Sequence, residues 1–127
     1  MRFCVPVPCF FGGMDFCAAI KKVRELGFDA AETYDWKSLD LERVRQTCAE
    51  TGVELLSMCT TEFNMTAPEK RKDWLAGLKE SCGAAQKAGV KRLITQVGQD
   101  TGEERAYQHE SIVSALREAR PILEESG

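Results

Sequence analysis

The chain has 127 residues, 43% of them apolar, and 17 basic against 20 acidic side chains give it a net charge of −3. This length is enough for one domain with a hydrophobic core, so we expect a single domain over residues 1–127, and the acidic balance argues against a nucleic-acid partner. No apolar run approaches the roughly 20 residues that span a bilayer and the N-terminus lacks a signal-peptide pattern, which argues against a membrane partner and predicts a cytoplasmic location.

The first predicted unit is a strand over Phe3–Val7 followed by a helix. Pro6 has no N–H to donate to a neighbouring strand, so we expect this strand to be short or to lie at a sheet edge. Asp15 is a suitable N-cap for the helix. Apolar residues then recur at helical spacing and predict one buried stripe, formed by Phe16, Ala19, Ile20, Val23 and Leu26.

The second unit is a strand over Asp29–Tyr34 and a helix that Asp40 caps. The third unit begins with Val53–Thr60, which is nearly continuous in apolar character. Such a run is typical of a strand covered on both faces in a parallel sheet. A capping box, Thr66–Glu69, then opens the helix of this unit.

The fourth unit is a strand over Lys91–Val97 and a helix that a second capping box, Thr101–Glu104, opens. The helical spacing predicts that its inward-facing residues are Ile112, Leu116, Ala119 and Leu123.

Three of the four helices end at a glycine that a strand follows, at Gly27, Gly52 and Gly89. Glycine just past a helix supplies the left-handed backbone conformation that ends it. Gly127 offers the same stop with no strand after it. We therefore expect an α/β fold of parallel strands alternating with helices, in which four βα units form half of a (β/α)₈ barrel cut before strand five. A small doubly wound sheet is the alternative.

In both architectures ligands bind beyond the carboxyl ends of the strands, and this rule selects a few residues. Glu32 lies in an otherwise apolar strand, where a carboxylate is costly unless it is paired or lies at a polar mouth. It is a ligand contact or charge partner at the barrel mouth, or else it pairs with a neighbouring arginine or lies at an exposed strand end. Gln96 ends the fourth strand beside a glycine, and its amide contacts a substrate hydroxyl or a neighbouring loop.

The six cysteines include no C-x-x-C pair, and His109 is the single histidine, so the spacing of a zinc site is missing. We expect reduced, buried cysteines, with Cys9 and Cys59 as the candidates for an exposed thiol. His109 follows the start of the fourth helix on its predicted inward stripe. It is a candidate at the rim of the binding site or a structural histidine.

The fourth unit, from Lys91 to Arg105 with Gln108 and His109, resembles the sugar phosphate isomerase/epimerase family, the xylose isomerase-like TIM barrels. Within that family it is most similar to hydroxypyruvate isomerase-like proteins. Gly27–Glu32 and Thr51–Leu56 support the resemblance, which covers the whole chain but only the first half of the family barrel.

The resemblance implies a metal-assisted isomerisation or epimerisation, in which carboxylates and a divalent cation (Mn, Mg or Co) move a proton through an enediol. The substrate would be a small carbohydrate or a hydroxy-keto acid. The family's catalytic glutamates and metal ligands come from strands five to eight, so neither a catalytic nor a metal-ligating role transfers to this chain, which we expect to be inactive alone. Glu32, Cys59 and Gln96 match positions near the substrate pocket.

Two other functions stay open: a non-catalytic binding domain, and an endonuclease IV-like repair barrel, which the acidic charge disfavours. A half barrel would leave its first and fourth strands with unpaired edges. We therefore expect the chain to pair with another copy of itself or with a complementary C-terminal half barrel.

Overall fold

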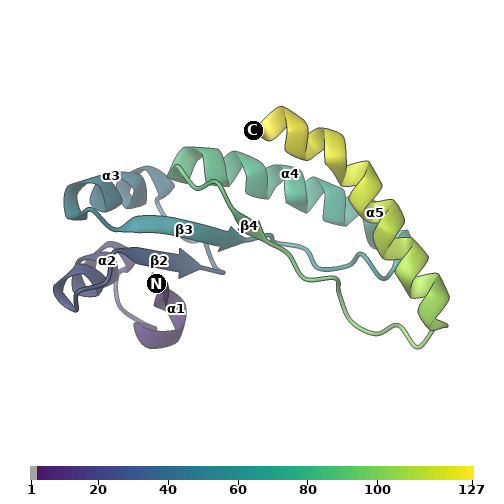
Figure 1. Cartoon of the computed structure of the whole chain (residues 1–127), viewed down its shortest axis with the longest axis horizontal. Coiled ribbons are helices and arrows are strands. Elements are labelled where there is room, and N and C mark those ends of the chain that lie inside the picture. Colours follow the sequence, from purple (N-terminus) through teal and green to yellow (C-terminus); the bar gives the residue numbers. More distant parts are fainter. Residues whose placement is uncertain (1–2) are drawn as a thin grey trace. The chain divides into compact units, whose positions relative to one another are not determined.

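A computed structural model describes residues 3–127 of the chain, in which four strands alternate with helices (Figure 1). The strands form one sheet in the order β1-β2-β3-β4. The elements are β1 (Val5–Pro6), α1 (Val7–Phe10), α2 (Phe16–Glu25), β2 (Ala30–Thr33), α3 (Leu41–Thr51), β3 (Glu54–Cys59), the short 3₁₀ helix η1 (Pro68–Lys70), α4 (Arg71–Ala88), β4 (Leu93–Ile94) and α5 (Arg105–Ser126).

The strands are parallel, as the alternation of strands and helices predicts. Between β2 and β3 the register is interrupted: Ala31 lies opposite Leu55, but Glu32 lies opposite Ser57. One residue of β3, Leu56, is therefore extra, as in a β-bulge. This irregularity decides which side chain of β3 lies beside Glu32.

The predicted helix ends are confirmed at Gly27, Gly52 and Gly89, whose φ angles are 88°, 70° and 74°. A side chain is disfavoured at such positive φ values, so glycine ends each helix without strain. The predicted caps of the first two long helices are also confirmed. Asp15 accepts a hydrogen bond from the amide of Ala18, and Asp40 accepts one from the amide of Arg43.

Both predicted capping boxes are wrong. The hydroxyl of Thr66 donates to the carbonyl of Gln99 instead of capping a helix, and the segment continues through η1 into α4. Helix α5 begins at Arg105, after the whole Thr101–Glu104 segment, and Glu104 makes no side-chain cap. At Thr66 the side chain that could cap a helix bonds to a distant loop, and at Thr101–Glu104 the segment forms local hydrogen bonds with Asp100 and Gln108 before the helix begins.

The first and fourth strands are shorter than predicted, at two residues each. Residues Val7–Phe10 form the short helix α1 in place of the end of the first strand. Pro8 lies in the first turn of this helix, where a missing N–H carries no penalty.

The chain divides into two compact units. The first unit comprises the chain up to Cys59 together with Ala84–Leu93, and the second comprises Thr60–Gly83 and Ile94–Gly127. In the first unit, α2 and α3 pack against each other beside β2 and β3 (Figure 1). Its apolar core includes Ile20, Val23, Val44, Val53, Leu55 and Met58, with Ala84, Ala85 and Ala88 from the end of α4.

In the second unit the inward face of α5 matches the predicted stripe only in part: Ala119 is buried and Ile112 is partly buried. Leu116 and Leu123 are 48% and 46% exposed. The buried positions of α5 are small or polar: Gln108, Ser111, Ala115 and Ala119. Among residues 3–127, no helix has both the length and the apolar character that crossing a membrane requires.

Candidate functional site

Glu32 lies near the carboxyl end of β2 and is partly exposed to solvent. The bulge in β3 brings Ser57 opposite it, and the Ser57 hydroxyl donates a hydrogen bond of 3.0 Å to Glu32 Oε2. No basic side chain among residues 3–127 forms an ion pair with Glu32. The alternative that an arginine neutralises this carboxylate therefore does not hold in this part of the chain.

The other carboxylate oxygen of Glu32, Oε1, has no hydrogen-bond partner within residues 3–127. Oε1 is not among the buried side-chain atoms that lack a partner, so it is open to water and can accept from a ligand in its place. Ser57 thus fixes one oxygen of the carboxylate and leaves the other available for an external hydroxyl or amine.

Cys59 ends β3 in the same unit and is partly buried. The indole N–H of Trp36 donates to the Cys59 carbonyl at 2.8 Å, which ties the strand end to the loop after β2. Burial raises the pKa of the Cys59 thiol, and the negative charge of Glu32 raises it further. The thiol is therefore protonated at neutral pH and is a poor nucleophile. Of the two thiols predicted to be exposed, Cys9 is exposed and Cys59 is only partly so.

The other two predicted site residues, Gln96 and His109, belong to the second unit, and both are exposed. The predicted placement of His109 on an inward stripe is wrong, because its neighbour Gln108 takes the buried position. The structure thus brings Glu32 and Cys59 together within the first unit and describes Gln96 and His109 separately. The substrate-binding role of all four remains a prediction.

His109 lines a hollow of about 440 Å³ in the second unit, together with Arg105, Asp100 and Gln108. Asp100 accepts hydrogen bonds from the amide of Gly102 at 2.9 Å and from the side chain of Gln108 at 2.8 Å. These bonds, the first above all, lower the pKa of the Asp100 carboxyl. Asp100 is therefore ionised at neutral pH and orders the loop that precedes α5.

A divalent cation, which the resemblance implies, does not fit the residues described here. Among residues 3–127 no three His, Cys, Asp or Glu side chains come close enough together to hold a metal ion. Glu32 and Cys59 supply two such groups at most, and the thiol is protonated. A protein site for Mn²⁺ or Mg²⁺ needs several oxygen ligands, so the described residues do not form one by themselves.

The sequence did not predict Ser57 as a site residue, and it placed Gln108 at the rim without predicting that this side chain is buried. Ser57 is one of two hydroxyl residues in an apolar strand, and this composition is a signal that could have found it. Its position opposite Glu32 depends on the bulge, which the sequence does not reveal. Gln108 is buried although its neighbours are exposed, because its amide bonds to Asp100 and to the carbonyl of Glu103.

The alternation of strands and helices with a rim carboxylate is compatible with many barrels, and a family comparison distinguishes among them. The family described as xylose isomerase-like TIM barrel matches residues 20–127. The chain belongs to this family. No curated protein matches the sequence.

Solved structures confirm the fold of this xylose isomerase-like chain. A family 2 AP endonuclease from Brucella melitensis is 14% identical, with a TM-score of 0.88 over 99% of this chain and 52% of its own. The 3-keto-D-glucoside 4-epimerase of E. coli is 17% identical, with a TM-score of 0.82 over 100% of this chain and 54% of its own. A sugar phosphate isomerase/epimerase from Parabacteroides distasonis is 10% identical, with a TM-score of 0.77 over 99% and 48%.

The chain thus spans about half the length of these solved structures. The predicted fold class is confirmed: the four parallel strands and their helices match half of a TIM barrel, and the doubly wound alternative is wrong. At these identities the solved structures establish the fold alone. They include a 3-keto-D-glucoside 4-epimerase, a sugar phosphate isomerase/epimerase and a family 2 AP endonuclease, so the family does not by itself select the reaction.

Proposed function

We propose that this chain contributes one side of the substrate pocket of a sugar or hydroxy-keto acid isomerase of the hydroxypyruvate isomerase type. Glu32 carries the proposal. Its position near the carboxyl end of a parallel strand is where barrels of this class bind their ligands.

In this proposal Glu32 binds a substrate hydroxyl. Ser57 holds Oε2, so the carboxylate has one orientation, and Oε1 accepts a hydrogen bond from the ligand. A hydrogen bond to an ionised acceptor contributes about 1.5 to 3 kcal/mol, more than a neutral one. The Cys59 thiol lies beside the same carboxylate and, being protonated, can donate weakly to a ligand oxygen.

Small polyols and hydroxy-keto acids match this arrangement because they present hydroxyls to a carboxylate acceptor. Gln96 and His109 belong to the second unit, and their contact with a substrate stays a prediction from the sequence. Both side chains are exposed and therefore accessible to a ligand.

The proton transfer itself is assigned to residues outside this chain. The described residues do not hold a metal ion by themselves, so any divalent cation would be bound by the rest of a complete barrel. The expected contribution of this chain is to bind and orient the substrate. We therefore expect no turnover by the chain alone.

Calorimetric titration with hydroxypyruvate tests this role. We expect weak binding, with a Kd on the order of 1 mM, and at least a roughly tenfold loss of affinity in Glu32→Gln, which corresponds to about 1.4 kcal/mol. Glu50→Gln is the matched control, because Glu50 is an exposed carboxylate of α3 that bonds only locally to Gln46. Equal affinity of Glu32→Gln and the unmodified chain would refute the proposal, and turnover by the chain alone would refute the assignment of proton transfer elsewhere.

A repair activity is a second candidate, because one of the similar solved structures is a family 2 AP endonuclease. The net charge of −3 disfavours a repair activity, because affinity for DNA depends on basic side chains that neutralise its phosphates. A gel-shift assay with abasic-site duplex at physiological salt distinguishes the two candidates. We expect no shift, and a shift competed by unlabelled abasic-site duplex would favour repair.

A further inference from the structure

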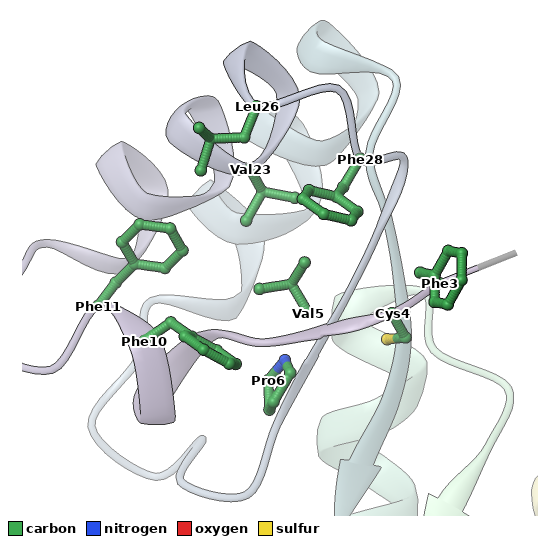
Figure 2. Close-up of a pocket in the computed structure, with 9 residues that line it drawn as sticks. All are labelled: Phe3, Cys4, Val5, Pro6, Phe10, Phe11, Val23, Leu26 and Phe28. Atoms are coloured by element: carbon green, nitrogen blue, oxygen red, sulfur yellow. The ribbon is translucent and has the colours of Figure 1, made fainter.

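The first unit contains an open apolar groove of about 270 Å³ beside the edge strand β1. Figure 2 shows its lining side chains, which come from β1 and the two residues before it, from the end of α1 and the residue after it, and from α2 and the turn that leads to β2. The groove is lined by hydrocarbon side chains such as Val5, Phe10, Phe11, Val23, Leu26 and Phe28.

Several of these side chains are unusually exposed for their size. Phe10 is 72% exposed and Leu26 is 57% exposed. Helical spacing predicted that Leu26 belongs to the buried stripe of α2. Of the other residues of that stripe, Ala19, Ile20 and Val23 are fully buried and Phe16 is partly buried. A contiguous apolar surface of this kind usually marks an interaction site.

The same position in the two following units is covered. Phe28, Val53 and Val90 each come directly after a helix-ending glycine with positive φ, so they occupy equivalent places in successive βα units. Val53 and Val90 are 1% and 6% exposed, whereas Phe28 is 37% exposed. Val53 belongs to a buried cluster that contains Ala84, Ala85 and Ala88 of the next long helix, α4. Phe28 is thus less covered than its two equivalents and adds apolar surface to the groove.

The strand order shows on which side of β1 a further strand could pair. β1 lies at one edge of the sheet, with β2 on its other side. In a closed (β/α)₈ barrel the first strand pairs in parallel with the last one, and the helix of that last unit packs beside it. The similar solved structures extend beyond the match by about as much chain again, which is the length of four further units.

We propose that this groove seats the final βα unit of a complementary half barrel of the xylose isomerase-like family. The strand of that unit lies parallel to β1, and an apolar helix face inserts between Phe10 and Leu26 and covers Phe28. Pro6 has no N–H, so backbone pairing with β1 is short and the apolar contact supplies most of the affinity. The inference rests on the proposed half-barrel role, but it involves none of the residues assigned to the substrate.

The proposal is tested by measuring whether this chain binds a separate second half of a barrel. The tagged second halves of the Brucella melitensis and E. coli solved structures are each co-expressed with this chain, and the complexes are measured by co-purification and by amide hydrogen exchange of β1. We expect a complex with at least one half, with the Val5 amide and the end of α2 exchanging more slowly in it. Leu26→Asp and Phe10→Ser should each weaken the complex at least tenfold, since both place polar groups in an apolar contact.

Met14→Asp is the matched control, because Met14 is 49% exposed in the same unit and does not line the groove. It should change the affinity less than twofold. All three variants alter exposed side chains, so their melting curves should match that of the unmodified chain, and a tenfold effect with unchanged melting isolates the groove.

Three outcomes would overturn the proposal: no complex with either half, a complex in which β1 exchanges as fast as in the free chain, or equal weakening by Met14→Asp. A fourth is a dimer of the chain alone, seen by light scattering, with a protected β1 that Leu26→Asp dissociates. The occupant would then be a second copy. The Glu32→Gln titration with hydroxypyruvate fails or succeeds independently, so the two proposals are separable.

Discussion

Both units bury large apolar side chains, such as Ile20 and Met58 in the first and Trp74 in the second, and both bury hydroxyls. They differ in what the buried polar groups bond to, because those of the second unit hold irregular loop segments. In the second unit Ser111 donates to the carbonyl of Met65 at 2.6 Å, and Ser81 accepts from the amide of Thr61 at 3.2 Å. These bonds fix the irregular segment between β3 and α4. A loop without regular secondary structure needs side-chain partners for its backbone groups, whereas strands and helices satisfy their own.

This contrast predicts different responses to mutation: lost volume should matter most in the first unit, and lost or crowded polar contacts in the second. The largest expected effect is that of Ile20→Ala. Ile20 is fully buried in the apolar core, so we expect a loss of about 2 to 5 kcal/mol in the free energy of unfolding. Urea denaturation followed by circular dichroism measures it. Ile94→Ala, at a site 44% exposed, is the control, and a loss below about 1 kcal/mol in Ile20→Ala would contradict the contrast.

Arg71→Ala should have the next largest effect, in the second unit. The Arg71 guanidinium bonds to the carbonyl and hydroxyl of Ser111, to Ser114 and to Glu118, at 2.9 to 3.0 Å. Its removal leaves the Ser111 carbonyl short of a partner, and we expect a loss of about 1 to 3 kcal/mol. The exposed Arg117→Ala is the control, and urea denaturation of both variants compares them. Equal losses in the two would show that these bonds do not hold the second unit together.

Gly77→Ala and Gly83→Ala form a pair on the same helix with opposite expected signs. A Cβ at Gly77 would lie 2.6 Å from Glu62 Cγ and 2.8 Å from Thr61 Oγ1, whereas a Cβ at Gly83 meets nothing within 4 Å. We expect Gly77→Ala to destabilise by about 1 to 2 kcal/mol through crowding and Gly83→Ala to stabilise by up to about 1 kcal/mol through helix propensity. Thermal melting compares them. Two changes of the same sign would disprove the close approach of the loop to α4.

The smallest expected effect is on acid stability, and both units should show it. Hydrogen bonds from the backbone amide of Ala18 and the side chain of Arg43 lower the pKa of Asp15 below 3.8, and those from Gly102 and Gln108 lower the pKa of Asp100. Because these carboxyls are more acidic in the folded chain, they stabilise it above about pH 3.8, and this stabilisation is lost as the pH falls through the lower folded pKa.

Acid titrations of stability measure this effect. Asp15→Asn and Asp100→Asn should each flatten the decline in stability below pH 4. Slopes identical to that of the unmodified chain in both Asp variants would contradict the lowered pKa values.

Some helix starts were predicted correctly from local signals and others were not. Local signals predicted the caps at Asp15 and Asp40 correctly, because each cap is a contact between residues three apart. The boxes at Thr66 and Thr101 have an equally good local pattern and still fail. Thr66 bonds to Gln99, 33 residues away, and this distant partner competes with the cap.

The candidate site was predictable only in part. The position of Glu32 in an apolar strand identified it as a candidate, because a carboxylate there is costly in free energy unless it is paired or solvated. Its partner Ser57 could not be assigned, because an alternating pattern does not reveal where a bulge adds a residue. Spacing predicted buried positions for Leu26, Leu116 and Leu123, and all three are exposed.

The sequence by itself determined the alternation of strands and helices, because glycines at positive φ and local caps act within a few residues of the chain. The tertiary structure alone decided that Glu32 faces Ser57, that α5 buries Gln108 and Ser111 in place of its leucines, and that Phe28 is exposed where Val53 and Val90 are covered. Each of these depends on which distant segment packs against a residue, and the periodicity of a single segment carries no information about its neighbour.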